Sequence, residues 1–201
     1  LSTVEFRQER AAAVVLLVDA RDEAYVAADP DRRNAVERSV DAATQSFASL
    51  LDAGDRVGIA ALSPRECWLS PGAGREHRTR GRTLFGTHPA FSPAPPDRLY
   101  AVPKEVRRLR RRLPSDAQVV FFSPLVDEDA VGVARHLDAH GHPVTVVSPD
   151  ETADDTVYRR LARLERRNRI TRLRRAGVRV IDWADEPLAA RVARAEGRWS
   201  R

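Results

Sequence analysis

An apolar run near the start of the chain ends abruptly in a carboxylate. Residues 11–19 consist of Ala, Val and Leu up to the closing Asp19. A short run of this kind is typical of a strand that is buried on both faces of a sheet. In open α/β sheets, ligands gather just beyond the carboxyl ends of such strands. The pattern therefore predicts a first strand over 11–19, with Asp19 at the edge where binding usually occurs.

The rest of the chain alternates between helical and strand-like spacing of apolar residues. Helical periodicity over 33–53 stops before Gly54, a residue that favours the end of a helix. Residues 57–62 form a second apolar strand, and 66–69 follow as its hairpin partner. Further helices are predicted over 102–113, 127–140, 154–176 and 186–196, and further strands over 119–123, 144–148 and 178–181.

Residues 71–97 are the least regular part of the chain. They contain four glycines and five prolines. We expect a long surface loop there, with at most a short helix. Loops of this length are uncommon inside a compact domain and are often functional. The alternative is an insertion without a function of its own.

The predicted helix over 154–176 is rich in arginine. We assign its apolar residues to one face, which would pack on the sheet, and its arginines to the solvated face. The apolar set is Val157, Leu161, Leu164, Ile170 and Leu173.

The alternation of strands and helices continues to the end of the chain. It predicts an α/β fold with a doubly wound, mostly parallel sheet and helices on both faces. The 201 residues suit a single domain over 11–201, after a lead-in over 1–10 from a preceding segment. Met is absent and the first residue is Leu1, so we expect a piece of a longer protein. No apolar stretch approaches the roughly 18 residues of a membrane span.

Positive charge is concentrated in two clusters. The net charge is +5, and almost all basic residues are arginine. Residues 104–112 carry six basic groups beside Glu105, and residues 158–179 carry ten arginines beside Glu165. Such clusters bind nucleic acid or anionic surfaces in other proteins. The alternative is that the arginine stems cover apolar surface. Nucleic acid is the less favoured partner, because aromatic residues for stacking are only 6% of the chain.

Common catalytic motifs are missing from the sequence. There is no Gly-x-Ser-x-Gly nucleophile turn. No glycine-rich phosphate loop follows Asp19. The single Cys67 excludes a cysteine-based zinc cage, and we expect it to be buried and inert. These absences argue against an enzyme.

Three histidines surround the end of the helix predicted over 127–140. His136 and His140 are four residues apart, a spacing that occurs in zinc sites, and His142 follows closely. However, Leu137 stands where a metalloprotease has glutamate. Histidines near a helix C-terminus also suit the helix dipole. We therefore favour a structural role for them.

Several segments resemble a von Willebrand factor A domain. They are the lead-in over 4–10, the strand that ends at Asp19, and the stretch Gly-Asp-Arg-Val-Gly-Ile over 54–59. The stretch Val-Val-Phe-Phe-Ser-Pro-Leu over 119–125 resembles an apolar strand that ends in Ser-Asp-Leu. That strand belongs to the A-like domain of the "domain of unknown function 58" proteins. The resemblance covers residues 4–183 and implies the A-like fold.

The resemblance also implies where a metal would bind. In that fold an Asp-x-Ser-x-Ser loop, a Thr and a later Asp hold a divalent cation, which then accepts a carboxylate from a partner protein. Asp19 matches the first Asp. Arg21 and Glu23 replace the two serines. Pro124 stands where the later Asp is expected, after Ser123.

A fixed positive charge close to Asp19 argues against a bound cation. Two unit charges 4 Å apart interact by about 4 kcal/mol at an effective dielectric constant of 20. We expect Arg21 to neutralise Asp19 internally, so no cofactor is predicted. The alternative is a rebuilt site for Mg²⁺ or another divalent cation, formed by Asp19, Glu23 and Asp127 with help from Asp22.

The resemblance implies a non-enzymatic protein–protein interaction module of a larger, membrane-associated protein. Six residues are predicted to form its partner-binding, degenerate metal site: Asp19, Arg21, Asp22, Glu23, Ser123 and Asp127. The implied partner is a MoxR-type AAA+ ATPase, and the implied location is the cytoplasmic side of the membrane. The alternatives are cation-dependent binding at the rebuilt site, and binding of nucleic acid or an anionic surface by the arginine-rich helices.

Overall fold

Six strands form one sheet in the part of the chain that the structure describes. A computed structural model describes residues 12–29, 31–97, 101–152 and 156–184. The strand order is β3-β2-β1-β4-β5-β6. The strands are β1 Ala13–Asp19, β2 Arg56–Leu62, β3 Trp68–Gly72, β4 Ala117–Phe122, β5 Val144–Pro149 and β6 Arg179–Trp183. Neighbouring strands are parallel, except that β3 is antiparallel to β2.

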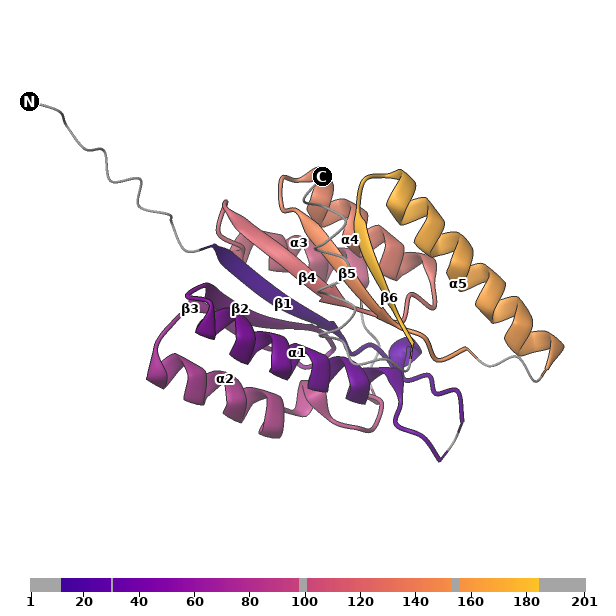
Figure 1. Cartoon of the computed structure of the whole chain (residues 1–201), viewed down its shortest axis with the longest axis horizontal. Helices are drawn as coiled ribbons and strands as arrows, with labels where there is room; N and C mark the ends of the chain where they lie inside the picture. Colours follow the sequence, from indigo (N-terminus) through magenta and orange to yellow (C-terminus); the bar gives the residue numbers. More distant parts are fainter. Residues whose placement is uncertain (1–11, 30, 98–100, 153–155, 185–201) are drawn as a thin grey trace, which may run out of the picture.

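Helices cover both faces of this sheet (Figure 1). They are α1 Ala35–Asp52, α2 Arg75–Thr87, α3 Val102–Arg112, α4 Glu128–Ala139 and α5 Val157–Arg175, with short turns η1 Asp22–Ala24 and η2 Pro89–Phe91. In Figure 1, α1 and α2 lie on one face, and α3, α4 and α5 lie on the other. The predicted doubly wound, mostly parallel α/β fold is therefore confirmed.

Strand β1 lies at the centre of the sheet and belongs to both cores. All seven of its residues are buried. Successive side chains of a strand point to opposite faces. Leu16 therefore joins the core under α1 and α2, and Leu17 joins the core under α3, α4 and α5. The prediction of a strand buried on both faces is confirmed, and Asp19 is its last residue.

Helix α1 has a well-defined start and end. The Asn34 side chain accepts a hydrogen bond from the backbone N–H of Glu37, and the Glu37 side chain accepts one from the N–H of Asn34, both at 3.0 Å. Such a reciprocal capping box satisfies two backbone donors that the first turn leaves free. The helix is followed by Gly54, whose φ of +93° suits glycine. The predicted helix over 33–53 is confirmed to within two residues.

The prediction of a loop over 71–97 is wrong. Helix α2 occupies half of this segment, and Phe85 and Phe91 are buried beside Phe47. A Cβ atom on Gly81 would lie 2.2 Å from Cζ of Phe47. Gly81 thus gives the Phe47 ring room against α2. A glycine in this role resembles a loop residue in the sequence, although it serves helix packing.

The single apolar face predicted for the helix over 154–176 is also wrong. Ile170 and Leu173 are buried, whereas Leu161 and Leu164 are each 52% exposed. Each leucine lies nine residues before its buried counterpart, which is about two and a half turns at 3.6 residues per turn. The two pairs therefore lie on opposite faces of α5.

Two predicted segments, the lead-in over 1–10 and the helix over 186–196, lie outside the described residues. Within the described ranges, no helix is both long and apolar enough to cross a membrane.

We expect Gly81→Ala to destabilise the domain by about 1–3 kcal/mol, because the added methyl group would overlap the buried Phe47 ring. Urea denaturation measures the change in the free energy of unfolding. Gly86→Ala is the matched control in the same helix, since a Cβ there meets nothing within 4 Å. The control should leave stability unchanged or raise it by about 0.5–1 kcal/mol. Equal effects at both positions would contradict the packing role of Gly81.

Candidate functional site

The carboxyl edge of the sheet brings four of the predicted site residues together. Asp19 ends β1, and Arg21 follows two residues later. Ser123 follows β4, and Asp127 is the N-cap residue of α4. Because β1 and β4 are parallel neighbours, their carboxyl ends lie side by side.

Arg21 binds two carboxylates at once. Its side chain is buried, with 1% of the residue exposed. Nε and Nη2 donate to Oδ1 and Oδ2 of Asp19 at 2.8 and 2.9 Å. Nη1 and Nη2 donate to Oδ2 and Oδ1 of Asp127 at 2.9 and 3.1 Å. The guanidinium group thus forms a two-sided fork, and the predicted neutralisation of Asp19 by Arg21 is confirmed.

Other groups of the same chain complete the coordination of these carboxylates. The hydroxyl of Ser123 donates to Oδ2 of Asp19 at 2.8 Å and accepts from the N–H of Leu125 at 3.2 Å. The N–H of Ala130 donates to Oδ1 of Asp127 at 2.9 Å. Buried carboxylates need such partners, because an unpaired one is costly away from water.

The electrostatic environment favours the charged forms of Arg21 and Asp127 and the neutral form of Tyr25. Burial alone would lower the pKa of Arg21, but hydrogen bonds and charges from Asp19 and Asp127 outweigh burial and raise it. Burial would raise the pKa of Asp127, yet the hydrogen bonds from Arg21 and from the Ala130 N–H lower it overall. Burial, then the charges of Asp19 and Asp22, raise the pKa of Tyr25 to about 12.

Asp22 and Glu23 take no part in this network. Both lie in η1 with exposed side chains, whereas Asp19 is completely buried. Among the residues that the structure describes, no three His, Cys, Asp or Glu side chains are grouped to hold a metal ion. The four carboxylates of the alternative cation site are therefore not grouped in the described structure, because Arg21 lies between Asp19 and Asp127 and η1 exposes Asp22 and Glu23.

Two further arginines, which we did not predict, seal the same edge next to β5 and β6. Arg166 of α5 is 5% exposed. Its Nη2 donates to Oγ of Ser148 at 2.9 Å and to Oδ1 of Asp182 at 2.8 Å. Arg38 of α1 forms an ion pair with Glu151. The carboxyl ends of β1, β4, β5 and β6 are thus closed by internal charge pairing.

The sequence contains a signal for Arg166. It lies four and seven residues before Ile170 and Leu173, so it shares their buried face. A charged residue on a buried helical face implies a buried partner. Arg38 carries no comparable signal, because its partners lie more than a hundred residues away in sequence.

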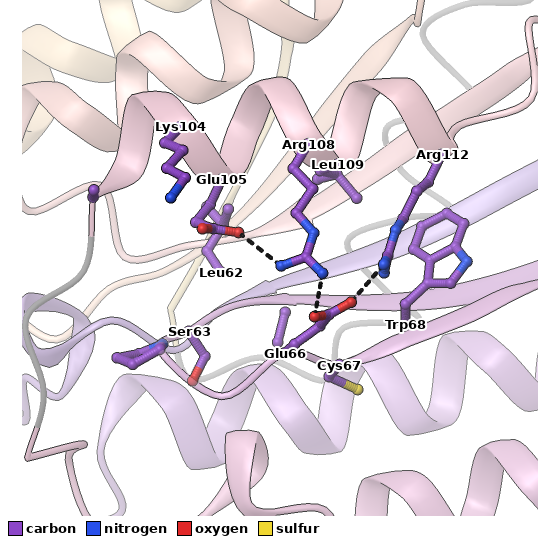
Figure 2. Close-up of a pocket in the computed structure, with 13 residues that line it drawn as sticks. Leu62, Ser63, Glu66, Cys67, Trp68, Lys104, Glu105, Arg108, Leu109 and Arg112 are labelled. Carbon is purple, nitrogen blue, oxygen red and sulfur yellow. Dashed lines mark hydrogen bonds and ion pairs between the residues drawn. The ribbon is translucent and has the colours of Figure 1, made fainter.

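A separate cleft of about 440 Å³ lies between α3 and the segment that joins β2 to β3 (Figure 2). Glu66 accepts a hydrogen bond there from Arg108 at 2.5 Å and pairs with Arg112 at 2.6 Å. Figure 2 shows Lys104 at the rim. Internal pairing with Glu66 therefore neutralises part of the basic cluster over 104–112.

Burial and hydrogen bonds determine the environments of Cys67 and of the histidines near the end of α4. Burial raises the pKa of the Cys67 thiol to about 12, which keeps it protonated. Nδ1 of His142 lies 3.2 Å from the carbonyl oxygen of Ala117. Nδ1 of His140 lies 2.7 Å from the carbonyl oxygen of His136. These contacts agree with a structural role for His140 and His142.

Comparisons with known proteins identify similar structures. No protein-family profile matches the chain, and no curated protein does. The conserved hypothetical protein BatB from Bacteroides thetaiotaomicron has a TM-score of 0.52 at 10% identity, covering 92% of this chain and 96% of BatB. The SpRpn10 VWA domain has a TM-score of 0.46 at 12% identity, covering 88% and 90%. An uncharacterized membrane spanning protein from Vibrio fischeri has a TM-score of 0.28 at 10% identity, covering 94% and 99%.

These similarities concern the fold alone, and BatB has the highest TM-score of these three structures. Together with the mostly parallel sheet and its antiparallel edge strand, the overlap with BatB identifies a von Willebrand factor A-like fold.

We expect Asp127→Asn to reduce the loss of stability in acid. The folded-state pKa of Asp127 is below its ordinary value of 3.8. Its carboxylate therefore stabilises the fold above about pH 4, and this contribution disappears as the pH falls through the lowered pKa. Asparagine still caps a helix. Urea denaturation between pH 6 and pH 2 should give a shallower decline for the variant than for the wild type. Asp116→Asn, an exposed control, should follow the wild-type curve, and parallel curves for Asp127→Asn would contradict the assignment.

Proposed function

We propose that this chain is a non-enzymatic protein-interaction module with a degenerate metal-ion-dependent adhesion site. The observation that carries the proposal is the two-sided fork of Arg21, which supplies a positive charge between Asp19 and Asp127. In the metal-dependent members of the resembled fold, a cation has that position and bridges to a partner. Here Arg21 connects Asp19 to Asp127, a carboxylate of the same chain. On this proposal the chain therefore binds its partner without a metal ion.

The acidic groups that remain exposed at the same edge support direct charge pairing with a partner. Asp22 and Glu23 are exposed in η1, and the side chain of Asp127 is 29% exposed. Exposed charges of this kind set the rate and the specificity of association more than its affinity. A partner would therefore present basic residues to η1 and to the start of α4.

We further propose that the chain is an A-like domain of the "domain of unknown function 58" type. The resemblance of residues 54–59 and 119–125 to that group supports this assignment. On this proposal its partner is a MoxR-type AAA+ ATPase, and the domain works on the cytoplasmic side of a membrane as part of a membrane-anchored protein.

The experiment is a binding titration between the full chain and a purified MoxR-type ATPase encoded in the same genome. We expect a complex whose dissociation constant changes less than about twofold between Mg²⁺ and EDTA when no nucleotide is present. Asp22→Asn combined with Glu23→Gln should weaken the complex about tenfold, because two charges at the interface are removed.

The matched control makes the same charge change at the opposite edge of the sheet. Asp116 precedes β4 and Glu76 lies in the first turn of α2, which follows the antiparallel β3; both are exposed. Asp116→Asn with Glu76→Gln should bind like the wild type. A complex that EDTA abolishes would contradict metal independence. The absence of any complex would contradict the ATPase as the partner, and equal losses in both double variants would contradict the assigned edge.

A further inference from the structure

The outer face of α5 carries the exposed large apolar side chains of the described residues. They are Val157 at 76% exposure, Tyr158 at 81%, and Leu161 and Leu164 at 52% each. These four residues, which we call the α5 stripe, span the first two turns of the helix. Single exposed apolar residues are normal on protein surfaces, but a continuous group of them marks an interaction site.

The α5 stripe is additional to the face by which α5 packs on the sheet. Leu161 and Leu164 lie opposite Ile170 and Leu173, as the spacing of nine residues requires. Further along the helix, the outward positions are polar, for example Thr171. A helix that is apolar on one side needs one packing partner. In the first two turns of α5 the large apolar side chains are on the outward side, where they remain exposed and have no packing partner among the described residues.

The position of the stripe makes it accessible to another molecule. Helix α5 follows β5 and so begins on the side of the carboxyl edge. In Figure 1 its N-terminal half diverges from the sheet, while its C-terminal half lies close to β6. The apolar surface thus projects from the domain on the same side as η1, but on a separate element.

The charges beside the stripe determine which partner fits. Arg160 and Arg167 are exposed next to it, and the one acidic residue of the helix, Glu165, is already paired with Arg169 at 3.5 Å. A second copy of this chain would bring arginines against arginines, which is unfavourable. Acidic side chains around an apolar strip would instead complement both features of this surface.

We propose that the α5 stripe is a docking surface for an amphipathic helix of another protein, with acidic residues on both sides of its apolar face. Helices recognise apolar surfaces through residues spaced by three, four and seven positions, and the stripe offers the same spacing in return. The inference rests on the proposed function only in that the domain binds other proteins, and it uses a surface that contains none of the predicted site residues.

The test uses a synthetic helical peptide with leucines at that spacing and glutamates on both flanks, labelled with a fluorophore. Fluorescence anisotropy measures its binding to the full chain. We expect saturable binding that Leu161→Ser with Leu164→Ser weakens at least about tenfold. Asn168→Ser with Thr171→Ser, exposed positions on the same helix, is the control and should bind like the wild type.

A second peptide, with lysines in place of the glutamates, tests the charge. We expect it to bind at least about tenfold more weakly than the acidic peptide. Failure of the acidic peptide to bind, equal binding by the leucine double variant, or equal binding of both peptides would overturn the proposal. A wild-type chain that co-sediments with phosphatidylglycerol vesicles, and a leucine double variant that does not, would assign the stripe to a membrane surface. That result would also overturn the proposal.

Variants in η1 separate this inference from the proposed function. Asp22→Asn with Glu23→Gln should bind the acidic peptide like the wild type. If the wild-type chain binds the acidic peptide but forms no complex with the ATPase, the proposed function alone is contradicted. If it binds the ATPase but not the peptide, the α5 stripe alone is contradicted.

Discussion

The fork between Arg21, Asp19 and Asp127 is the interaction on which the rest of the structure depends. Asp19 ends the central strand and is completely buried, where an unpaired carboxylate would be strongly unfavourable. Arg21 supplies the opposite charge, and its second pair of bonds reaches the first residue before α4. One side chain therefore neutralises the centre of the sheet edge and fixes α4 against it.

Internal pairing of arginines with polar groups is repeated along the carboxyl edge of the sheet. Arg166 and Arg38 satisfy the polar groups beyond β5 and β6. The crevice at the carboxyl edge of an open α/β sheet usually binds a ligand. Here the chain's own charged side chains occupy it. What the domain still presents on this side is the acidic turn η1 and the apolar start of α5, which suit a protein partner better than an ion or a small molecule.

The sequence predicts the fold well because the buried strands are nearly pure apolar runs. The prediction from sequence is wrong where a residue type has two interpretations. Gly81 suggests a loop, but it accommodates the Phe47 ring in a helix. The leucines of α5 have helical spacing that suggests a single apolar face, but they lie on opposite faces. The pairing of Arg21 with Asp19 is predictable because the two are close in the chain. The contact of Arg21 with Asp127 spans 106 positions, and only the parallel pairing of β1 with β4 brings those residues together.

The free energy of unfolding of Arg21→Met tests the central claim most directly. Methionine keeps an unbranched side chain but removes the positive charge, so Asp19 and Asp127 would face each other unpaired. Urea denaturation at pH 7 should show a loss of about 3–5 kcal/mol, the usual cost of removing one partner of a buried ion pair. Arg82→Met, at an exposed position of α2, should change stability by less than about 0.5 kcal/mol. A loss for Arg21→Met no larger than that of the control would contradict the account.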